Sequence, residues 1–379
     1  MNFKIIKDLK PYLLVALIPL VFTIIFGAMF SPIYIRDIPI AVMDMDSSKN
    51  SVDVIRMLDE SETLKIHQEY TSMEEIKDKI LEGEICGAIV IPRGFGESIR
   101  AKTGAEATVL MDNANFMLGN NLTGAINTIF ETINAGIQIK YLEAGAQVPF
   151  EAKQNVYTLS LADRVLYNPQ LSYIYYMYPG FLAIFIQQTY LAALVPMLIE
   201  EKDRLKDMSD HHLAKELIKV KVGLFLRRIL LLTGLSLIST MICIKTAEAL
   251  CGVPMRGDIV GILILQIFFT FSLTGLCILI AAVFEQVAHG AQFTMFLTIP
   301  TFLSCGYAWP YYLVDAKLTA IFKLTWPLQY FVNPLKDIML KAQSLEVKYL
   351  LQMLAFGAVW MLIGVFFYKR KVAIIREMS

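Results

Sequence analysis

Six long stretches of almost uninterrupted apolar residues dominate the pattern of hydrophobic and polar positions. They lie at residues 11–30, 175–199, 223–245, 259–282, 291–309 and 349–368. Each is long enough to cross a hydrocarbon layer of about 30 Å as an α-helix, which rises about 1.5 Å per residue. The pattern therefore predicts a polytopic α-helical membrane protein with six transmembrane helices, of which the last five form one group over residues 175–379.

A long hydrophilic segment, residues 31–174, separates the first apolar stretch from the second. Within it, short apolar runs typical of strands alternate with amphipathic stretches typical of helices. The expected strands are 38–43, 64–70, 85–91 and 107–111, and the expected helices are 47–58 and 72–82. After Asn113 the spacing becomes that of a long helix, which packs either on the sheet or on a partner copy. The segment predicts a mixed α/β domain inserted between helices 1 and 2.

Basic residues flank both ends of the chain and predict its orientation. Lys4, Lys7 and Lys10 precede the first apolar stretch, and Lys369–Lys371 follow the last. Because positive flanks stay in the cytoplasm, both termini are expected there, and the domain 31–174 is expected to be extracytoplasmic. The first stretch exceeds the ~7–15 apolar residues of a cleaved signal peptide, so it is expected to remain as an anchor. Residues 1–30 then form an interfacial helix and the first transmembrane helix.

Composition and motifs exclude several other classes of function. Hydrophobic residues make up 56% of the chain and charged residues 18%, which excludes a soluble enzyme. The 34 basic residues are matched by 34 acidic ones, so no nucleic-acid partner is expected. The five cysteines and four histidines form no metal-binding or nucleophile pattern. No Gly-Lys dipeptide occurs, so the chain has no P-loop, and any ATP must be bound by another chain.

Two carboxylates, Asp44 and Asp46, follow the first expected strand in the sequence Asp-Met-Asp-Ser-Ser. Alternating carboxylates could form half of a metal-binding loop. The glycine and the closing glutamate of a calcium loop are absent, however. We therefore expect no metal site. Instead, Asp46 or Ser47 is expected to cap the following helix by accepting hydrogen bonds from its first N–H groups.

Polar side chains inside the apolar stretches are candidates for function, because an unpaired polar group in hydrocarbon is costly. Gln187, Gln188 and Thr189 lie near the middle of the second stretch, and Gln266 lies inside the fourth. They could hydrogen-bond one helix to another, or they could line a substrate route. The sequence leaves both alternatives open.

The segment between the second and third stretches, residues 200–222, is densely charged and is expected in the cytoplasm. Leu213, Leu217 and Val220 fall at helical spacing within it. A charged amphipathic helix of this kind is either a docking site for a cytoplasmic partner or an interfacial helix without a partner.

The layout of the whole chain and several of its motifs resemble the permease subunits of type-2 ABC exporters. This branch has one transmembrane helix, a large extracytoplasmic domain and five further helices. The matching motifs are Tyr-Asn-Pro at 167–169, Tyr-Pro-Gly at 178–180, Gly-Val-Pro-Met-Arg-Gly at 252–257, Ser-Cys-Gly-Tyr-Ala-Trp-Pro at 304–310 and Trp-Pro-Leu-Gln-Tyr-Phe at 326–331. Strand motifs at 41–46 and 91–95 are also similar.

The resemblance implies a bacterial inner-membrane exporter built from two permeases, either two copies or a copy and a paralogue. Separate cytoplasmic ABC ATPase subunits would bind ATP and Mg, so no cofactor is expected in this chain. The second and fifth helices would border the translocation route, with Gln187, Gln188, Thr189 and Gln266 as its candidate residues. An outer gate would follow the fifth helix. Its candidate residues are Gly306, Tyr307, Trp309, Pro310, Pro327, Tyr330 and Phe331.

The same resemblance implies that the segment 200–222 couples the permease to its ATPase. The Glu-x-Glu-x-Gly-Thr pattern of the family is only partly present, because Leu205 and Lys206 stand where Gly and Thr are usual. The candidate coupling residues are Glu201, Asp203, Arg204, Glu216 and Lys221.

Two other functions compete with export. In a surface receptor or envelope scaffold, the 31–174 domain would bind a ligand and the helices would only anchor it. A secondary transporter would carry paired ionisable residues at mid-membrane. The apolar stretches hold only Gln and Thr at that depth, so the permease is the preferred interpretation.

Overall fold

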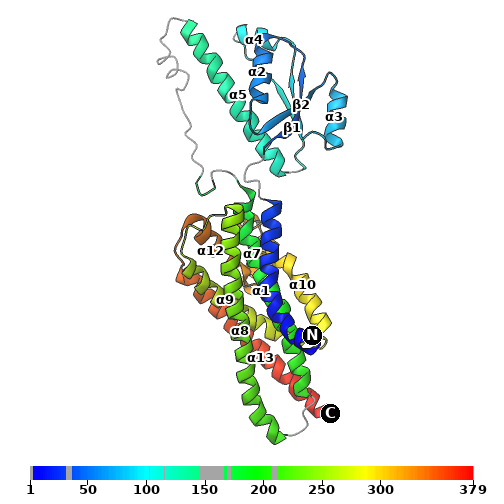
Figure 1. Ribbon diagram of the computed structural model, residues 1–379, viewed down its shortest axis with the longest axis vertical. Helices are drawn as coiled ribbons and strands as arrows, with labels where there is room; N and C mark the ends of the chain where they lie inside the picture. The colour runs from blue at the N-terminus through cyan, green and yellow to red at the C-terminus, as the bar shows by residue number, and fades with distance from the viewer. Residues whose placement is uncertain are drawn as a thin grey trace. The chain divides into compact units, whose positions relative to one another are not determined.

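The computed structural model describes residues 3–30, 36–101, 103–114, 116–144, 166–168, 172–206 and 211–378. The chain divides into two compact units. Tyr34–Arg164 form one, here called the sheet unit, and Met1–Ile33 with Val165–Ser379 form the other, here called the helical unit. Figure 1 labels the elements of both.

The sheet unit contains a four-stranded sheet with the strand order β2-β1-β3-β4. The strands are β1 (Ile38–Asp44), β2 (Leu64–Glu69), β3 (Gly87–Ile91) and β4 (Thr108–Met111), and the helices are α2 (Lys49–Asp59), α3 (Met73–Leu81), α4 (Phe95–Ala101) and α5 (Phe116–Ala144). β1 pairs in parallel with β2 and β3, whereas β4 is antiparallel to β3. Each strand and helix expected in this part of the chain has a counterpart within a few residues.

Helices cover both faces of this sheet: α2 and α5 lie on one face and α3 on the other (Figure 1). Side chains of β1 alternate between the two faces. Ile38 and Ile40 join the cluster under α2 and α5, while Ala41 and Met43 join the cluster under α3. Of the two partners expected for the long helix, the sheet is therefore the one it contacts, through buried residues such as Leu122.

The turn after β1 corrects the expected helix cap. Ser48, rather than Asp46 or Ser47, is the N-cap of α2 and accepts a hydrogen bond from Ser51 N. The Asp46 carboxylate instead accepts from Gly94 N at 2.8 Å and Gly96 N at 2.9 Å, which ties the β1–α2 turn to the start of α4. Among the described residues, no group of three or more potential metal ligands occurs.

Asp46 makes the stability of the sheet unit depend on pH. A hydrogen bond from the Ser48 hydroxyl, together with those from Gly96 N and Gly94 N, lowers the pKa of Asp46 below its ordinary value of 3.8. A carboxyl group whose folded-state pKa is lowered stabilises the fold above its unfolded-state pKa. This contribution is lost as the pH falls through the folded-state pKa.

We therefore expect Asp46→Ala to destabilise β1 and β3 toward urea at neutral pH, and to have a smaller effect below the lowered pKa. Pulsed hydrogen exchange of the full chain measures both. The control is Asp53→Ala on α2, where an exposed ion pair with Arg56 should contribute little. Equal effects of the two substitutions at neutral pH would contradict the assignment.

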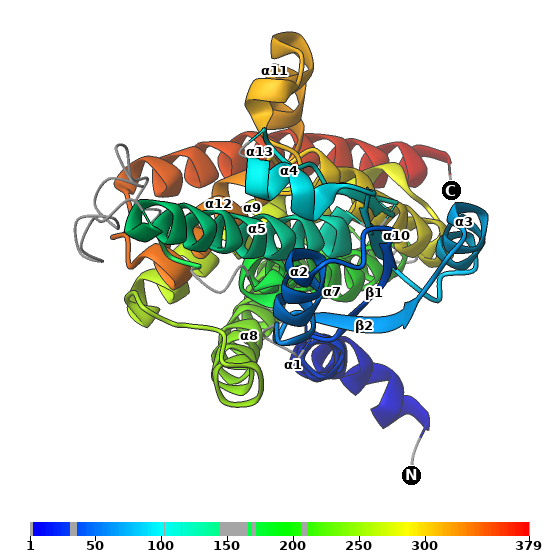
Figure 2. The same ribbon diagram turned by 90° about the horizontal axis from the view of Figure 1, so that it is seen from above.

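The helical unit is built around one central helix, α7 (Tyr173–Lys206). The other elements are α1 (Phe3–Met29), α8 (His211–Cys251), α9 (Ile259–Val283), α10 (Val287–Leu303), η1 (Tyr311–Leu313), α11 (Ala316–Thr325), α12 (Leu328–Lys341) and α13 (Val347–Met378). α7 packs against α1, α9, α10 and α12. In the most apolar part of α7, 72% of the residues are buried. The corresponding share is 22% for α1 and for α13, so these two helices expose broad apolar faces. Figure 2 looks down onto this arrangement.

Five of the described helices, α1, α7, α8, α9 and α13, are long and apolar enough to cross a membrane. The expected fifth helix over 291–309 differs from its prediction. α10 begins earlier and ends at Leu303, so it has only 17 residues, fewer than the ~20 needed to span the hydrocarbon layer. Gly306, three residues after the end of α10, has a left-handed backbone at φ +74°, which an α-helix over 291–309 could not contain.

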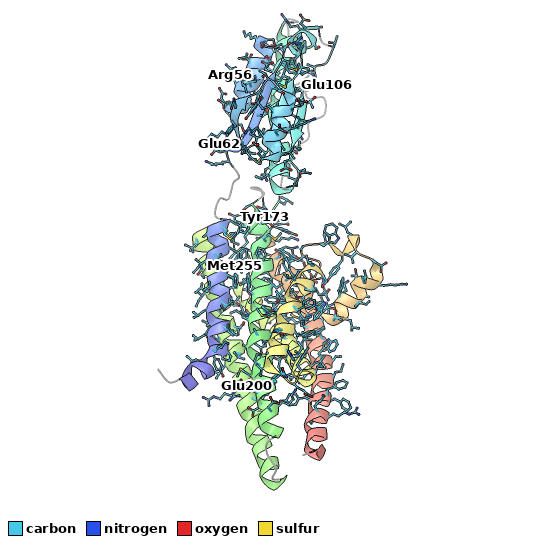
Figure 3. The ribbon with its side chains drawn as sticks, turned by 90° about the vertical axis from the view of Figure 1, so that its right-hand side faces the viewer. Arg56, Glu62, Glu106, Tyr173, Glu200 and Met255 are labelled. Carbon is cyan, nitrogen blue, oxygen red and sulfur yellow. The ribbon has the colours of Figure 1, made fainter. Side chains whose placement is uncertain are left out.

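Two expected short helices are parts of longer ones. The N-terminal interfacial helix and the first transmembrane helix form one continuous element, α1. Likewise, the amphipathic part of the segment 200–222 is the beginning of α8. Within the helical unit, Tyr173 and Met255 lie toward one end, while Glu200 lies toward the other (Figure 3).

Candidate functional site: outer gate and coupling end

A turn after α10 brings Tyr307 against the first turns of α7. The Tyr176 hydroxyl donates to Tyr307 O at 2.7 Å, and the Tyr307 hydroxyl donates back to Tyr176 O. The two rings stack with centroids 5.3 Å apart. Gly180 makes this approach possible, because a Cβ there would lie 2.6 Å from Tyr307 Cε1. The reciprocal hydrogen bonds and the missing side chain fix the position of Tyr307.

A second tyrosine, Tyr311, packs against the same turn. A Cβ on Gly306 would lie 2.4 Å from the Tyr311 ring, so both its left-handed backbone and its surroundings require glycine. The Tyr311 hydroxyl lies 2.5 Å from Gln329 Oε1, and Asn333 Nδ2 donates to Cys305 O at 3.2 Å. Through these hydrogen bonds, α12 holds the turn in place. Here the turn 304–307, its α7 contacts and its α12 contacts are called the outer gate, after the role that the sequence led us to expect for this segment.

The remaining candidate gate residues have different surroundings. Phe331 is buried and stacks on Phe269 of α9 with ring centroids 4.2 Å apart, so it belongs to the packing between α12 and α9. Trp309 is 57% exposed. Pro310 and Pro327 precede η1 and α12 as N-cap residues.

Tyr330 connects two helices, since its hydroxyl donates to Lys323 O of α11 at 2.9 Å. Of the predicted set, Gly306 and Tyr307 lie in the turn 304–307, and Tyr307 is the one that contacts α7. Four residues of the gate were not among those predicted from the sequence: Tyr176, which stands one helical turn before Gly180, and Tyr311, Gln329 and Asn333. Gln329 lies inside the motif at 326–331 and could have been included on that ground.

The candidate route residues join helices of the same chain. Gln187 Nε2 donates to Thr301 Oγ1 at 3.0 Å, and Gln188 Oε1 accepts from Thr298 Oγ1, so both connect α7 to α10. Gln266 Nε2 donates to Ser236 Oγ at 2.9 Å and connects α9 to α8.

Each of the three glutamines therefore hydrogen-bonds one helix to another. Thr189 bonds only within its own helix, through Phe185 O at 2.8 Å and Ile186 O at 3.3 Å. Tyr190, which the sequence analysis did not select, makes a further connection. Its hydroxyl lies 2.9 Å from Thr274 Oγ1 of α9 and 3.3 Å from Thr233 Oγ1 of α8.

The opposite end of α7, residues 198–206, is here called the coupling end, after the role that the sequence led us to expect for it. Glu201 Oε2 lies 3.6 Å from Arg228 Nη1, which joins α7 to α8. The Tyr368 hydroxyl of α13 donates to Leu198 O at 3.0 Å. Asp203 is half-buried. Arg204, Glu216 and Lys221 lie on α7 and α8, but their side chains are outside the described part of the structure.

Comparison with known proteins identifies the family. A profile described as ABC-2 family transporter protein matches residues 10–366, which is nearly the whole chain. The chain belongs to the ABC-2 transporter family.

Two curated relatives from Escherichia coli K12 match this ABC-2 permease over most of its length. The "Probable multidrug ABC transporter permease YbhS" is 22% identical over 97% of this chain and 94% of the relative. The "Probable multidrug ABC transporter permease YbhR" is 21% identical over 88% of this chain and 86% of the relative. Both similarities extend through the sheet unit as well as the helical unit.

One arginine of the permease fastens the loop 252–257 to two other segments. Arg256 Nη1 donates to Leu340 O and to Tyr167 O, both at 2.8 Å, and Arg256 N donates to Met339 O at 2.9 Å. Leu340 and Met339 belong to the last turn of α12, where carbonyl groups lack helical partners. Arg256 thus positions the end of the helix that fastens the outer gate. The sequence analysis identified the motif that contains it but assigned Arg256 no role.

The sheet unit of the permease carries a groove of about 830 Å³ between α4, α5 and the segment before β4. α5 lines it with two parallel stripes. The apolar stripe is Ile126, Phe130, Ile133 and Ile137, and the polar stripe is Asn127, Glu131, Asn134 and Gln138. The groove is of a size that accommodates small molecules.

Proposed function

We propose that this chain is the permease subunit of an ATP-driven exporter in a bacterial inner membrane. Two permeases, either two copies or a copy and a paralogue, form the translocation route. Separate ABC ATPase subunits bind ATP and Mg and dock at the coupling end. The observation that carries the proposal is the continuity of α7, which bears the coupling end at one terminus and the Tyr176–Tyr307 contact of the outer gate at the other.

The proposed orientation places the termini and the coupling end in the cytoplasm and the sheet unit outside. α10 and the outer gate together make the sixth crossing, in which the gate is the re-entrant part. Irregular backbone at membrane depth is tolerated where it is buried in protein or lines a cavity. The hydrogen bonds from Tyr176 and Asn333 to the gate turn support this arrangement.

The second permease is proposed to pack against the face that α10 exposes beside α7. Phe296 and Ile299 are 72% and 69% exposed there. The hydrogen bonds of Gln187 and Gln188 hold α10 on α7. The route would then lie between the two α7–α10 pairs, and the three glutamines would stabilise its walls.

Co-purification tests this function directly. A tagged permease extracted in mild detergent is expected to carry a nucleotide-binding subunit, and Asp203→Lys is expected to lower its recovery about tenfold, because a charge at a docking surface is reversed. The matched control is Glu248→Lys at the far end of α8, where an exposed pair with Lys245 is lost.

Recovery of the permease without any nucleotide-binding partner, even after crosslinking at the coupling end, would contradict the proposal. It would favour the second candidate, a surface receptor or envelope scaffold. The groove in the sheet unit is the observation that supports this alternative.

A further inference from the structure

Lys202, at the coupling end of α7, is completely buried, with an exposed fraction of 0%. Its Nζ donates to Ala281 O at 2.6 Å and to Phe284 O at 2.5 Å. Lysine is rarely buried to this extent unless it is paired. The two carbonyl groups come from the end of α9, so Lys202 connects α7 to a different helix.

The acceptors of Lys202 lie at the sharp turn between α9 and α10. α9 ends at Val283 and α10 begins at Val287, so the turn contains only residues 284–286. The last carbonyl groups of a helix have no partner within it, and the helix dipole makes this end negative. The buried ammonium group of Lys202 therefore binds strongly to the carbonyl groups of this turn.

α10 extends from this turn to the outer gate. Its first residue is separated from Phe284 by two positions, and its last turn leads into Gly306 and Tyr307. At its beginning α10 also lies close against α7, because a Cβ on Gly290 would be 2.6 Å from Ile199 Cδ1. A displacement of the turn would thus be passed along a single short helix to the gate.

Stability alone gives no reason to keep this lysine. Exchanging buried charged groups for apolar residues of similar volume is often neutral or even stabilising. Methionine matches the length of the lysine stem and fills irregular apolar space well. What methionine cannot do is bind the two carbonyl groups of the turn.

We propose that Lys202 is a positioning residue that makes the α9–α10 turn, and with it α10, follow the movement of the coupling end. This inference rests on the proposed function. ATPase closure would move the coupling end of α7, Lys202 would carry the turn with it, and α10 would change the packing of Tyr307. Lys202 thereby connects nucleotide binding to the outer gate.

Cys305 provides a reporter that needs no knowledge of the substrate. Its side chain is 1% exposed within the gate. The permease–ATPase complex in nanodiscs is treated with a hydrophilic maleimide, with and without ATP, Mg and vanadate. Mass spectrometry then measures the labelling rate at Cys305 alone. In the wild-type complex we expect nucleotide to change this rate about tenfold, a coupling of ordinary size.

Lys202→Met should keep the ATPase bound but reduce the nucleotide effect to less than about twofold, because the turn is no longer held. Lys202→Arg, which keeps the charge and the donors, should restore most of the effect. The matched control is Lys371→Met on α13, which loses an exposed pair with Glu285 of the same turn; it should respond like wild type. A full nucleotide effect in Lys202→Met would overturn the proposal.

A second variant keeps the test decisive if Lys202→Met does not assemble. Insertion of two glycines between Glu285 and Gln286 leaves Lys202 and both carbonyl groups in place but makes the turn compliant. It should abolish the nucleotide effect, and an unchanged effect would overturn the proposal. If nucleotide does not change the labelling rate at Cys305 in the wild-type complex, or if no ATPase is recovered, the proposed function itself fails. These outcomes are distinct from a failure of the role proposed for Lys202.

Discussion

Gly180→Leu should open the outer gate permanently. The new Cβ would lie 2.6 Å from Tyr307 Cε1 and within 3.1 Å of two further ring atoms. Tyr307 cannot move aside without loss of its hydrogen bonds with Tyr176. The turn should therefore separate from α7, so we expect Cys305 to react with a hydrophilic maleimide about tenfold faster without nucleotide, since overpacking costs about 1–3 kcal/mol.

Gly234→Leu is the matched control for this substitution. Gly234 lies in the interior of α8, and a Cβ there would have no atom within 4 Å. Both variants add the same side chain to a membrane helix, but only one adds it at the gate. Equal labelling rates in the two variants would show that Tyr307 does not depend on the space at Gly180.

Gly275→Ala should strongly destabilise the helical unit, because α9 and α13 pack backbone against backbone at this point. A Cβ on Gly275 would lie 2.7 Å from Gly357 O and 2.9 Å from Met361 N. Backbone atoms of a helix cannot give way as a flexible side chain can. Close helix packing of this kind is typical of membrane proteins, where small residues let backbones approach.

We expect Gly275→Ala to lower the free energy of unfolding in mixed micelles by about 1–3 kcal/mol, as overpacking does. Gly261→Ala in the same helix is the control. Its new Cβ would be no closer than 3.7 Å to any neighbour, and alanine is the better helix former. Gly261→Ala should be neutral or slightly stabilising. Equal loss of stability in both variants would contradict the packing argument.

The two central strands, β1 and β3, could be predicted well because each is buried on both faces of the sheet. Such strands read as continuous apolar runs, as at 87–91, where the whole of β3 is buried. The cap of α2 could not be predicted in the same way. Asp46 finds its partners in Gly94 and Gly96, about fifty positions away in the chain, and no local pattern shows that contact.

The residues of the candidate site could likewise be selected from the sequence only in part. Tyr307 and Gly306 could be selected because the motif at 304–310 resembles that of the family. Tyr176 could not, because its role depends on which segment lies beside it. The glutamines were recognised as unusual in an apolar environment, yet only the structure shows that their partners are Thr298, Thr301 and Ser236.

The sequence by itself determined that the chain is a membrane protein with a hydrophilic segment near its beginning, because hydrophobicity and its period are local properties of a chain. It also carried the family motifs. Only the tertiary structure decided that α10 is too short to span the hydrocarbon layer, that Arg256 holds α12, and that Lys202 is buried against the end of α9. The contacts of Arg256 and Lys202 are hydrogen bonds between segments far apart in the chain, which form only when packing brings those segments together.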